Sequence, residues 1–258
     1  MKYSLRNIIF LFVLGVLLSF ASSAWAGAPE QVHVGDTQNW GDMLHSLSEW
    51  GMWKLLLGGL KTTLIILVFA AIGGVVLGAA LVYMDMSGRC RWFFKILDRF
   101  VSTVHDIPSV ALMMFFYYVI FAGKMNGLVV SIIALAVYMS GSLKKIFKSN
   151  IKHIGKGQIE AGLTLGLTKR QCYRYIVLPQ AVKSMLPLVI SELKLLLRIT
   201  SYAGYIAQED LIKSVYSVRE HYSDTFLPLL LVSIMYLIIS WLITKTMHLL
   251  YVKFFKYD

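Results

Sequence analysis

The sequence predicts an all-α integral membrane protein with about five core transmembrane helices. Of its 258 residues, 57% are hydrophobic and only 15% are charged, a composition too apolar for an ordinary soluble domain. The basic residues are concentrated in loops between apolar segments that are long enough to cross a bilayer. The net charge of +11 is therefore attributed to membrane topology, and we do not expect nucleic-acid binding.

The first 26 residues predict a secretory signal peptide. An apolar run at 8–18 follows two basic residues, and small residues lead to an A-x-A pattern that ends at Ala26. The run is short for a span, so we expect cleavage after Ala26, with an uncleaved first span as the alternative. Either outcome leaves residues 27–54 outside the cytoplasm, as a periplasmic or interfacial segment with tryptophan anchors.

Five apolar segments follow and define the predicted transmembrane domain at 55–252. Only the fourth contains ionisable side chains, which are Glu192, Lys194 and Arg198. We include it as a span because the loops on its two sides differ in charge. The predicted spans are 62–83, 107–123, 125–143, 187–208 and 225–244.

The distribution of lysine and arginine orients these spans. Residues 144–183 hold nine basic side chains against one acid, and residues 89–99 are also basic. Residues 209–224 instead carry four acids and two basic side chains. Because cytoplasmic loops are enriched in positive charge, we expect the two basic segments and the tail at 253–258 in the cytoplasm, and 209–224 outside.

Small residues mark one face of the first span. Gly74 and Gly78 form a G-x-x-x-G pair, and Gly73 precedes them. Glycines at this spacing let helices approach closely in lipid, although membrane helices also tolerate glycine without such a role. We expect only that this face packs against another helix.

The basic segment after the third span has strong local signals. Residues 157–165 predict a short helix, and Gly166 suits a left-handed end for it. Thr168 and Gln171 have the spacing of a capping box that opens a second short helix. Pro179 has no backbone N–H, so we expect the chain to turn there.

The same segment carries a set of residues at fixed spacing. Glu160, Ala161 and a small residue are followed after three positions by a glycine, and then after nine by Ile176, a spacer, Leu178 and Pro179. This pattern, E-A-small-x3-G-x9-I-x-L-P, resembles the cytoplasmic loop by which permease subunits of ABC importers contact their ATPases. A basic loop that docks on lipid headgroups is the alternative, but it explains the lysines and not the spacing.

The resemblance extends over 61–251 and is to the polar amino-acid uptake family of ABC importer permeases. Residues 61–64 (KTTL), 98–108 (DRFVSTVHDIP) and 197–201 (LRITS) resemble motifs of that family, with departures inside the last two. The family's E-x-x-R-G run after the third span is replaced by KKIFKS at 144–149. A permease of the same fold whose solute is not an amino acid therefore stays open as an alternative.

The resemblance implies the type I ABC importer permease fold, in the bacterial cytoplasmic (inner) membrane, and a transport role rather than an enzymatic one. The implied partners are a second permease subunit, identical or related, two ATP-binding subunits, an extracytoplasmic solute-binding protein and membrane lipid. The solute would move by alternating access. An ATPase-independent secondary transporter is a further alternative.

The resemblance also implies that ATP and Mg²⁺ are used by the partner ATPase. The sequence contains no Walker A motif, so we expect no cofactor, metal or catalytic site in this chain. The coupling loop is predicted at 150–183. The coupling residues implied are Glu160, Ala161, Gly162, Gly166, Leu178 and Pro179. Glu160 would contact the ATPase, Ala161 and Gly162 would allow close packing, and the glycine four residues further on would form the bend.

The fourth span supplies the candidate substrate path. Its members are Glu192, Lys194, Arg198, Thr200 and Ser201. Ionisable side chains inside a membrane are costly and are functional candidates. For Glu192, a substrate pocket and a structural ion pair are equally open interpretations. For Lys194 and Arg198 we favour an intersubunit ion pair or snorkelling to the interface.

Three residues before or at the start of the second span are gate candidates. They are His105, Asp106 and Pro108. One interpretation places them at the cytoplasmic mouth of the path. The interpretation we favour is that His105 and Asp106 are interfacial capping groups for the second span.

Overall fold

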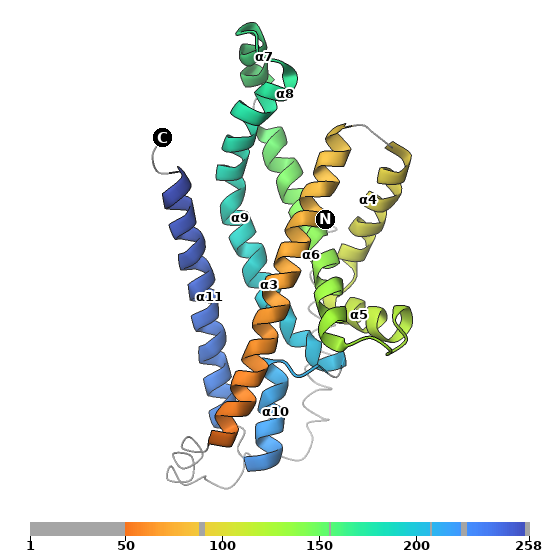
Figure 1. Cartoon of the computed structure of the whole chain (residues 1–258), viewed down its shortest axis with the longest axis vertical. Coiled ribbons are helices and arrows are strands. Elements are labelled where there is room, and N and C mark those ends of the chain that lie inside the picture. Colours follow the sequence, from red (N-terminus) through yellow and green to blue (C-terminus); the bar gives the residue numbers. More distant parts are fainter. Residues whose placement is uncertain (1–49, 88–90, 155, 207, 223–225, 256–258) are drawn as a thin grey trace, which may run out of the picture. The chain divides into compact units, whose positions relative to one another are not determined.

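The computed structural model describes residues 50–255 except 88–90, 155, 207 and 223–225 (Figure 1). The predictions for the signal peptide, for the segment up to residue 49 and for the end of the tail lie outside the described residues. The described part of the chain is helical, with no strand. Four of its helices are long and apolar enough to cross a membrane, or five if one bent pair counts as a span. The prediction of an all-α membrane protein is confirmed.

The helices follow one another closely along the chain. Their bounds are α3 Trp50–Ser87, α4 Arg91–Asp106, α5 Ser109–Met114, α6 Gly127–His153, α7 Lys156–Thr164, α8 Lys169–Cys172, α9 Leu178–Ile199, α10 Leu211–Tyr222 and α11 Phe226–Phe255. Two π-helical segments, Phe115–Ile120 and Tyr173–Val177, extend α5 and join α8 to α9. A 3₁₀ segment, Thr200–Ile206, continues α9.

The long helices run in alternating directions between two ends (Figure 1). We call the end with α7 and α8 the loop end, and the end with α10 the opposite end. The last residues of α3, α6 and α11 lie at the loop end, whereas α10 lies at the opposite end (Figure 1). The basic segments are therefore at one end and the acidic segment at the other. This separation is expected of a membrane protein, whose cytoplasmic loops are enriched in lysine and arginine.

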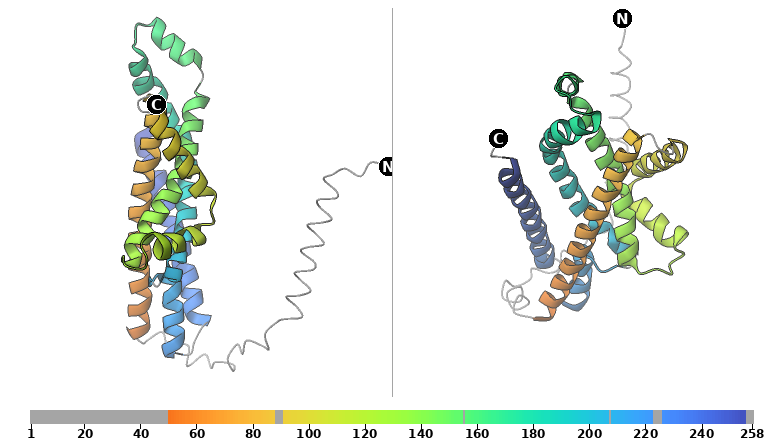
Figure 2. Two further views of the ribbon diagram at one scale, coloured as in Figure 1. Left: turned by 90° about the vertical axis from the view of Figure 1, so that its right-hand side faces the viewer. Right: turned by 45° about the horizontal axis from the view of Figure 1, so that its top comes forward.

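Helices α3 and α6 form the closest packed pair. A Cβ built on Gly73 would lie 2.9 Å from the Cβ of Ala136, and one on Gly74 would lie 2.9 Å from the Cβ of Met139. The same atom on Gly78 would lie 3.1 Å from the Cβ of a leucine one turn further along α6. Only glycine permits this approach, so the prediction that this face packs against another helix is confirmed. Figure 2 shows α4 and α11 on opposite sides of this pair.

The second span differs from its prediction. Residues 91–106, part of which was expected to be a basic loop, form the helix α4, and the chain then bends by 117° into α5. The bend is at Pro108, which precedes α5 with φ −53° and ψ 130°. A proline cannot donate the helical hydrogen bond and disfavours helical geometry in the residue before it, so α4 must end near Asp106.

The fourth span also differs. The chain does not turn at Pro179, because that residue lies in the first turn of α9. Helix α8, the π-helical segment, α9 and the 3₁₀ segment make one helical unit, Lys169–Ile206. A proline is tolerated in the first turn of a helix because an N–H at that position would have no hydrogen-bond partner. The wider π-helical turn before Pro179 also reduces the steric clash of the proline ring.

At the opposite end, α10 is held by a buried polar contact. Its first N–H, on Leu211, donates to Thr63 Oγ1 of α3 at 3.1 Å. Asp210 is fully buried and caps the helix, since its Oδ1 accepts from the N–H of Lys213 at 2.9 Å. The other carboxylate oxygen of Asp210 has no hydrogen-bond partner within the described residues. Burial raises the pKa of Asp210 to about 6.

Candidate coupling loop and translocation path

The first half of the coupling loop ends in a left-handed glycine. Helix α7 stops at Thr164, and Gly166 has φ +84°. The N–H of Gly166 donates to the carbonyl of Leu163 at 3.0 Å, and the N–H of Leu167 donates to that of Gly162 at 3.1 Å. This is the Schellman arrangement of a helix C-terminus. The predicted short helix and its left-handed end are confirmed.

The second half begins with the predicted capping box. The N–H of Thr168 donates to Gln171 Oε1 at 2.8 Å, and the N–H of Gln171 donates to Thr168 Oγ1 at 3.4 Å. Two of the free N–H donors at the start of α8 are thereby satisfied. The turn between α7 and α8 is therefore fixed from both sides by local hydrogen bonds.

The two halves pack against each other at Gly162. This residue is buried, and a Cβ on it would lie 2.8 Å from the Sγ of Cys172 and 2.9 Å from the Cδ1 of Ile176. A second tie joins Gln158 to Gln180, whose Nε2 donates at 2.7 Å. The side of α7 that carries Gly162 is thus occupied by the loop itself.

The other coupling candidates lie in two places. Glu160 and Ala161 are exposed on α7, so this pair and the bend at Gly166 are open to a partner. Leu178 and Pro179 are exposed at the start of α9. Leu178 lines an apolar groove beside α3 and α6, which separates it from the exposed pair on α7.

Three of the five substrate-path candidates line one pocket. Lys194, Arg198 and Ser201 face α11 across a cavity of about 540 Å³. Ser233, Tyr236 and Ser240 supply the polar side chains of the α11 wall. The sequence did not indicate this wall, because its hydroxyl groups are scattered in an apolar segment and face α9 only once the helices pack.

Glu192 and Thr200 do not line this pocket. Glu192 is half-buried on another face of α9, within electrostatic range of Tyr138 of α6. Thr200 is buried, and its hydroxyl donates to the carbonyl of Leu197 at 2.7 Å. Among the described residues, Glu192 makes no ion pair with Lys194 or Arg198.

The gate candidates sit at the bend between α4 and α5. His105 lies with Nδ1 3.3 Å from the carbonyl of Tyr138 and Nε2 3.5 Å from Ser142 Oγ. A Cβ on Gly141 would lie 2.7 Å from the Cβ of His105, so α4 touches α6 here. Neither His105 nor Asp106 caps α5, since its N-cap position is Pro108, without a side-chain bond. The capping interpretation is wrong because the proline takes that position.

Among the described residues, three ion pairs join α6 to neighbouring helices, and one of them joins Lys145 to the gate candidate Asp106 at 3.9 Å. Lys144 of α6 pairs with Asp98 of α4, and Lys148, one turn further, pairs with Asp85 of α3. From the sequence, Lys144 and Lys148 served as topology signals and as part of a departure from the family's motif, and no partner was predicted for either. Their spacing of four on one helix face was the available sign that they have partners on other helices.

The comparisons with known proteins agree with the geometry. The family described as "Binding-protein-dependent transport system inner membrane component" matches residues 82–255. The glutamate/aspartate import permease protein GltK of Escherichia coli O6:H1 is 28% identical over 197 residues, which cover 72% of this chain and 87% of GltK. The probable glutamine ABC transporter permease protein GlnP of Bacillus subtilis is 31% identical over 152 residues, covering 57% and 70%.

Two solved structures share the fold. An amino acid ABC transporter solved with histidines matches 84% of this chain and 100% of its own, with a TM-score of 0.73 and 22% identity. The MetNI methionine ABC transporter in an inward-facing conformation matches 79% and 97%, with a TM-score of 0.65 and 20% identity. The chain therefore has the type I permease fold and belongs to the family of binding-protein-dependent ABC importer permeases, multi-pass proteins of the bacterial inner membrane.

Proposed function

We propose that this chain is the membrane-spanning subunit of an ATP-driven, binding-protein-dependent importer for amino acids or similar small polar solutes. It would pair with a second permease subunit, two ATP-binding subunits and an extracytoplasmic solute-binding protein. The names of similar permeases, which include importers of glutamate, aspartate and glutamine, support the solute class. ATP and Mg²⁺ would be used by the partner ATPase.

One observation carries the mechanism. The helical unit Lys169–Ile206 runs without a break from the coupling loop to the pocket at Lys194 and Arg198. A continuous helix transmits displacement along its axis, whereas a flexible loop absorbs it. Closure of the ATPase dimer on ATP would push the exposed Glu160–Ala161 surface, and α9 would carry that motion to the pocket.

The pocket between α9 and α11 suits a carboxylate. Its lining, as far as the structure describes it, includes two cations, Lys194 and Arg198, three serine hydroxyls and a tyrosine hydroxyl, and no acid. An amino acid presents a carboxylate whatever its side chain, and a guanidinium or ammonium group with hydroxyl donors recognises it. Its volume of about 540 Å³ is in the range of small-molecule sites.

Uptake of labelled amino acids by the reconstituted importer tests this proposal. Arg198→Gln should lower uptake at least about tenfold by removing one charge-assisted contact to the carboxylate. Lys245→Gln, which removes an exposed cation from α11 outside the pocket, is the matched control and should transport normally. Normal uptake by Arg198→Gln together with normal assembly would exclude the pocket as the carboxylate site.

Glu192 carries a separate proposal, because it lies on a different face of α9. A carboxylate inside a membrane needs water or a partner, and a water-filled path supplies the first. Glu192→Gln keeps the shape and removes the charge. The variant should reduce uptake of cationic solutes most. If Glu192 has a purely structural role, the variant should instead lose assembly, and uptake of every solute should fall alike.

A further inference from the structure

A basic pocket and an apolar groove join at the loop end of the molecule. The basic pocket has a volume of about 640 Å³, and its cationic wall is Lys169, Arg170 and Arg174. The apolar groove has a volume of about 310 Å³ and lies between α3, α6 and α9. Four residues line both cavities. They are Tyr83, Met86, Ile151 and Leu178. The two cavities therefore form one continuous surface, polar at the end of the helices and apolar along them.

The pocket has a basic lining. Among the described residues, no acid lines it. The acid closest to its wall in sequence is Asp85, which lies between Tyr83 and Met86 but pairs with Lys148 of α6. The guanidinium of Arg174 also stands 5.8 Å from the ring centre of Tyr175. Three exposed cations beside tyrosine rings attract an anionic group.

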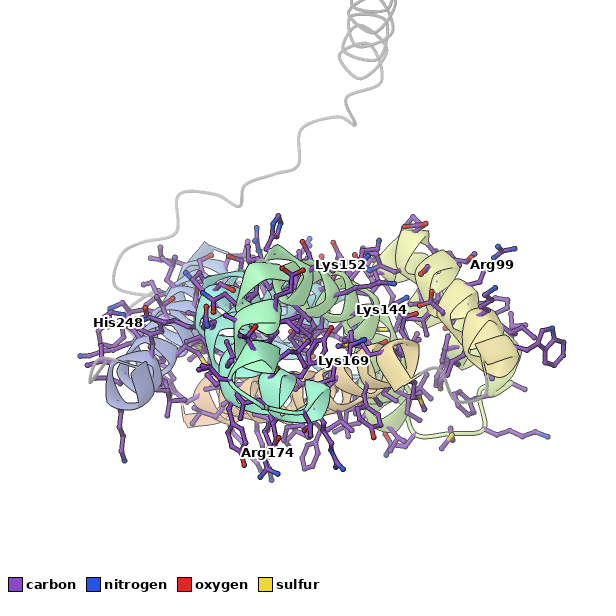
Figure 3. All side chains as sticks on the ribbon, turned by 90° about the horizontal axis from the view of Figure 1, so that it is seen from above. Arg99, Lys144, Lys152, Lys169, Arg174 and His248 are labelled. Atoms are coloured by element: carbon purple, nitrogen blue, oxygen red, sulfur yellow. The ribbon has the colours of Figure 1, made fainter. Side chains whose placement is uncertain are left out.

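The groove below the pocket presents surface suited to hydrocarbon. Ala79, Val82, Phe147, Val182 and Met185 line it together with the shared residues. Large apolar side chains at its upper rim are exposed, including Tyr83 at 72% and Leu178 at 50%. Seen from the loop end, Arg174 lies toward the same side of the molecule as α3, and Lys152 lies toward the opposite side (Figure 3). The pocket cation Arg174 is thus on the side of α3, and other basic residues such as Lys152 lie elsewhere on this end.

We propose that this surface binds one anionic phospholipid, with the phosphate in the pocket of Lys169, Arg170 and Arg174 and an acyl chain in the groove along α3, α6 and α9. An acidic segment of a partner protein would satisfy the cations but would leave the groove empty. A diacyl lipid satisfies both parts at once, because its charge and its hydrocarbon are joined at the depth where pocket meets groove. Under the proposed orientation, this lipid belongs to the cytoplasmic leaflet.

The experiment measures lipid retained by the purified importer complex. The complex is delipidated in detergent, titrated with phosphatidylglycerol or phosphatidylcholine, and examined by native mass spectrometry. Wild-type protein should bind phosphatidylglycerol at least about tenfold more tightly than phosphatidylcholine. The triple variant Lys169→Gln, Arg170→Gln, Arg174→Gln should lose that preference. The control triple variant Lys95→Gln, Arg99→Gln, Lys152→Gln removes the same charge from exposed positions outside the pocket and should keep it.

A second pair of variants tests the groove without changing charge. Ala79→Trp fills the groove from α3 and should weaken phosphatidylglycerol binding at least about tenfold. Val76→Trp adds the same ring at an exposed position one turn earlier, outside the groove, and should bind as wild type does. Two results would overturn the proposal: equal phosphatidylglycerol binding by both triple variants, or release of the ATPase from the pocket triple variant while Ala79→Trp binds lipid normally. The second result would assign the pocket to the ATPase.

Discussion

Two prolines, one at the start of a predicted span and one in the predicted coupling loop, have opposite effects on the chain. Pro108 separates α4 from α5 with a bend of 117°, whereas Pro179 lies inside a helical unit that continues for 38 residues. Both rings lack an N–H and exclude a normal helical turn before them. A π-helical turn, Tyr173–Val177, precedes Pro179, whereas Ile107 before Pro108 is not helical. Helix α9 also continues through Pro187, which has no π-helical turn before it, so the surrounding segment and not the ring alone decides whether a helix continues.

The comparison teaches that a proline marks a place of strain but does not decide how the strain is resolved. At Pro108 the bend lets His105 pack on Gly141 of α6 and sends α5 away from the helix axis. At Pro179 the wider turn keeps the coupling loop and α9 in one unit. The first region is built to change direction, and the second is built to transmit motion.

The strongest way to break this comparison is to remove each ring. Pro108→Ala should let α4 continue toward α5, because the proline is the identifiable cause of the bend. The α5 segment would then move, and transport should fall at least about tenfold. Pro179→Ala should leave the geometry and transport close to wild type, because α9 is already continuous there. Spin labels at Lys95 and Tyr118 report the α4–α5 distance. An unchanged distance in Pro108→Ala would show that packing, not the proline, sets the bend.

Gly166 in the coupling loop allows the effect of backbone conformation to be tested at a single position. A Cβ at Gly166 would meet nothing within 4 Å, so only its φ of +84° restricts the residue. Gly166→Val should therefore strain the turn by about 1–2 kcal/mol and lower transport per ATP hydrolysed several-fold. Gly166→Asn is the matched control, because asparagine tolerates the left-handed region. Equal transport by the two variants would remove the conformational argument for this glycine.

The coupling loop and the region around α4 also show which features can be predicted from the sequence. Gly166 and the Thr168–Gln171 box were predictable, because the bonds that fix them span at most five residues. Helix α4 was missed, since Lys95, Asp98 and Arg99 gave it the composition of a basic loop. Nothing local reveals that Asp98 meets Lys144 of α6.

The candidate site follows the same division. Lys194 and Arg198 were identified because charge in an apolar span is conspicuous, and Ser201 because residues 197–201 resemble a motif of the family. Their α11 partners were not, because Ser233 and Tyr236 become a pocket wall only through packing between helices distant in sequence. The burial of Asp210 likewise could not be predicted from the sequence, because residues 209–224 have the composition of an acidic loop outside the membrane.

The opposite end of the molecule, away from both prolines, should respond to pH. Burial raises the pKa of Asp210 from 3.8 to about 6, so the folded state binds more protons than the unfolded state between these values. The stability of α10 should therefore fall as pH rises from about 4 to above 6, by up to about 3 kcal/mol. Hydrogen exchange of residues 211–222 measures it. Asp210→Asn should remove the pH dependence, and its persistence would assign it to another group.

The measurement that most directly tests the account is transport per ATP hydrolysed when α9 is interrupted between the loop and the pocket. Lys183 is exposed in the interior of that helix, which already contains Pro187 one turn further on. Lys183→Pro therefore adds a second interior proline to the helical unit, at a cost of about 3 kcal/mol, whereas Lys183→Ala removes only the side chain. In proteoliposomes with the ATPase and the binding protein, Lys183→Pro should still hydrolyse ATP but move at least about tenfold less solute per ATP than Lys183→Ala. Equal coupling in the two variants would contradict the claim that α9 carries motion from the loop to the pocket.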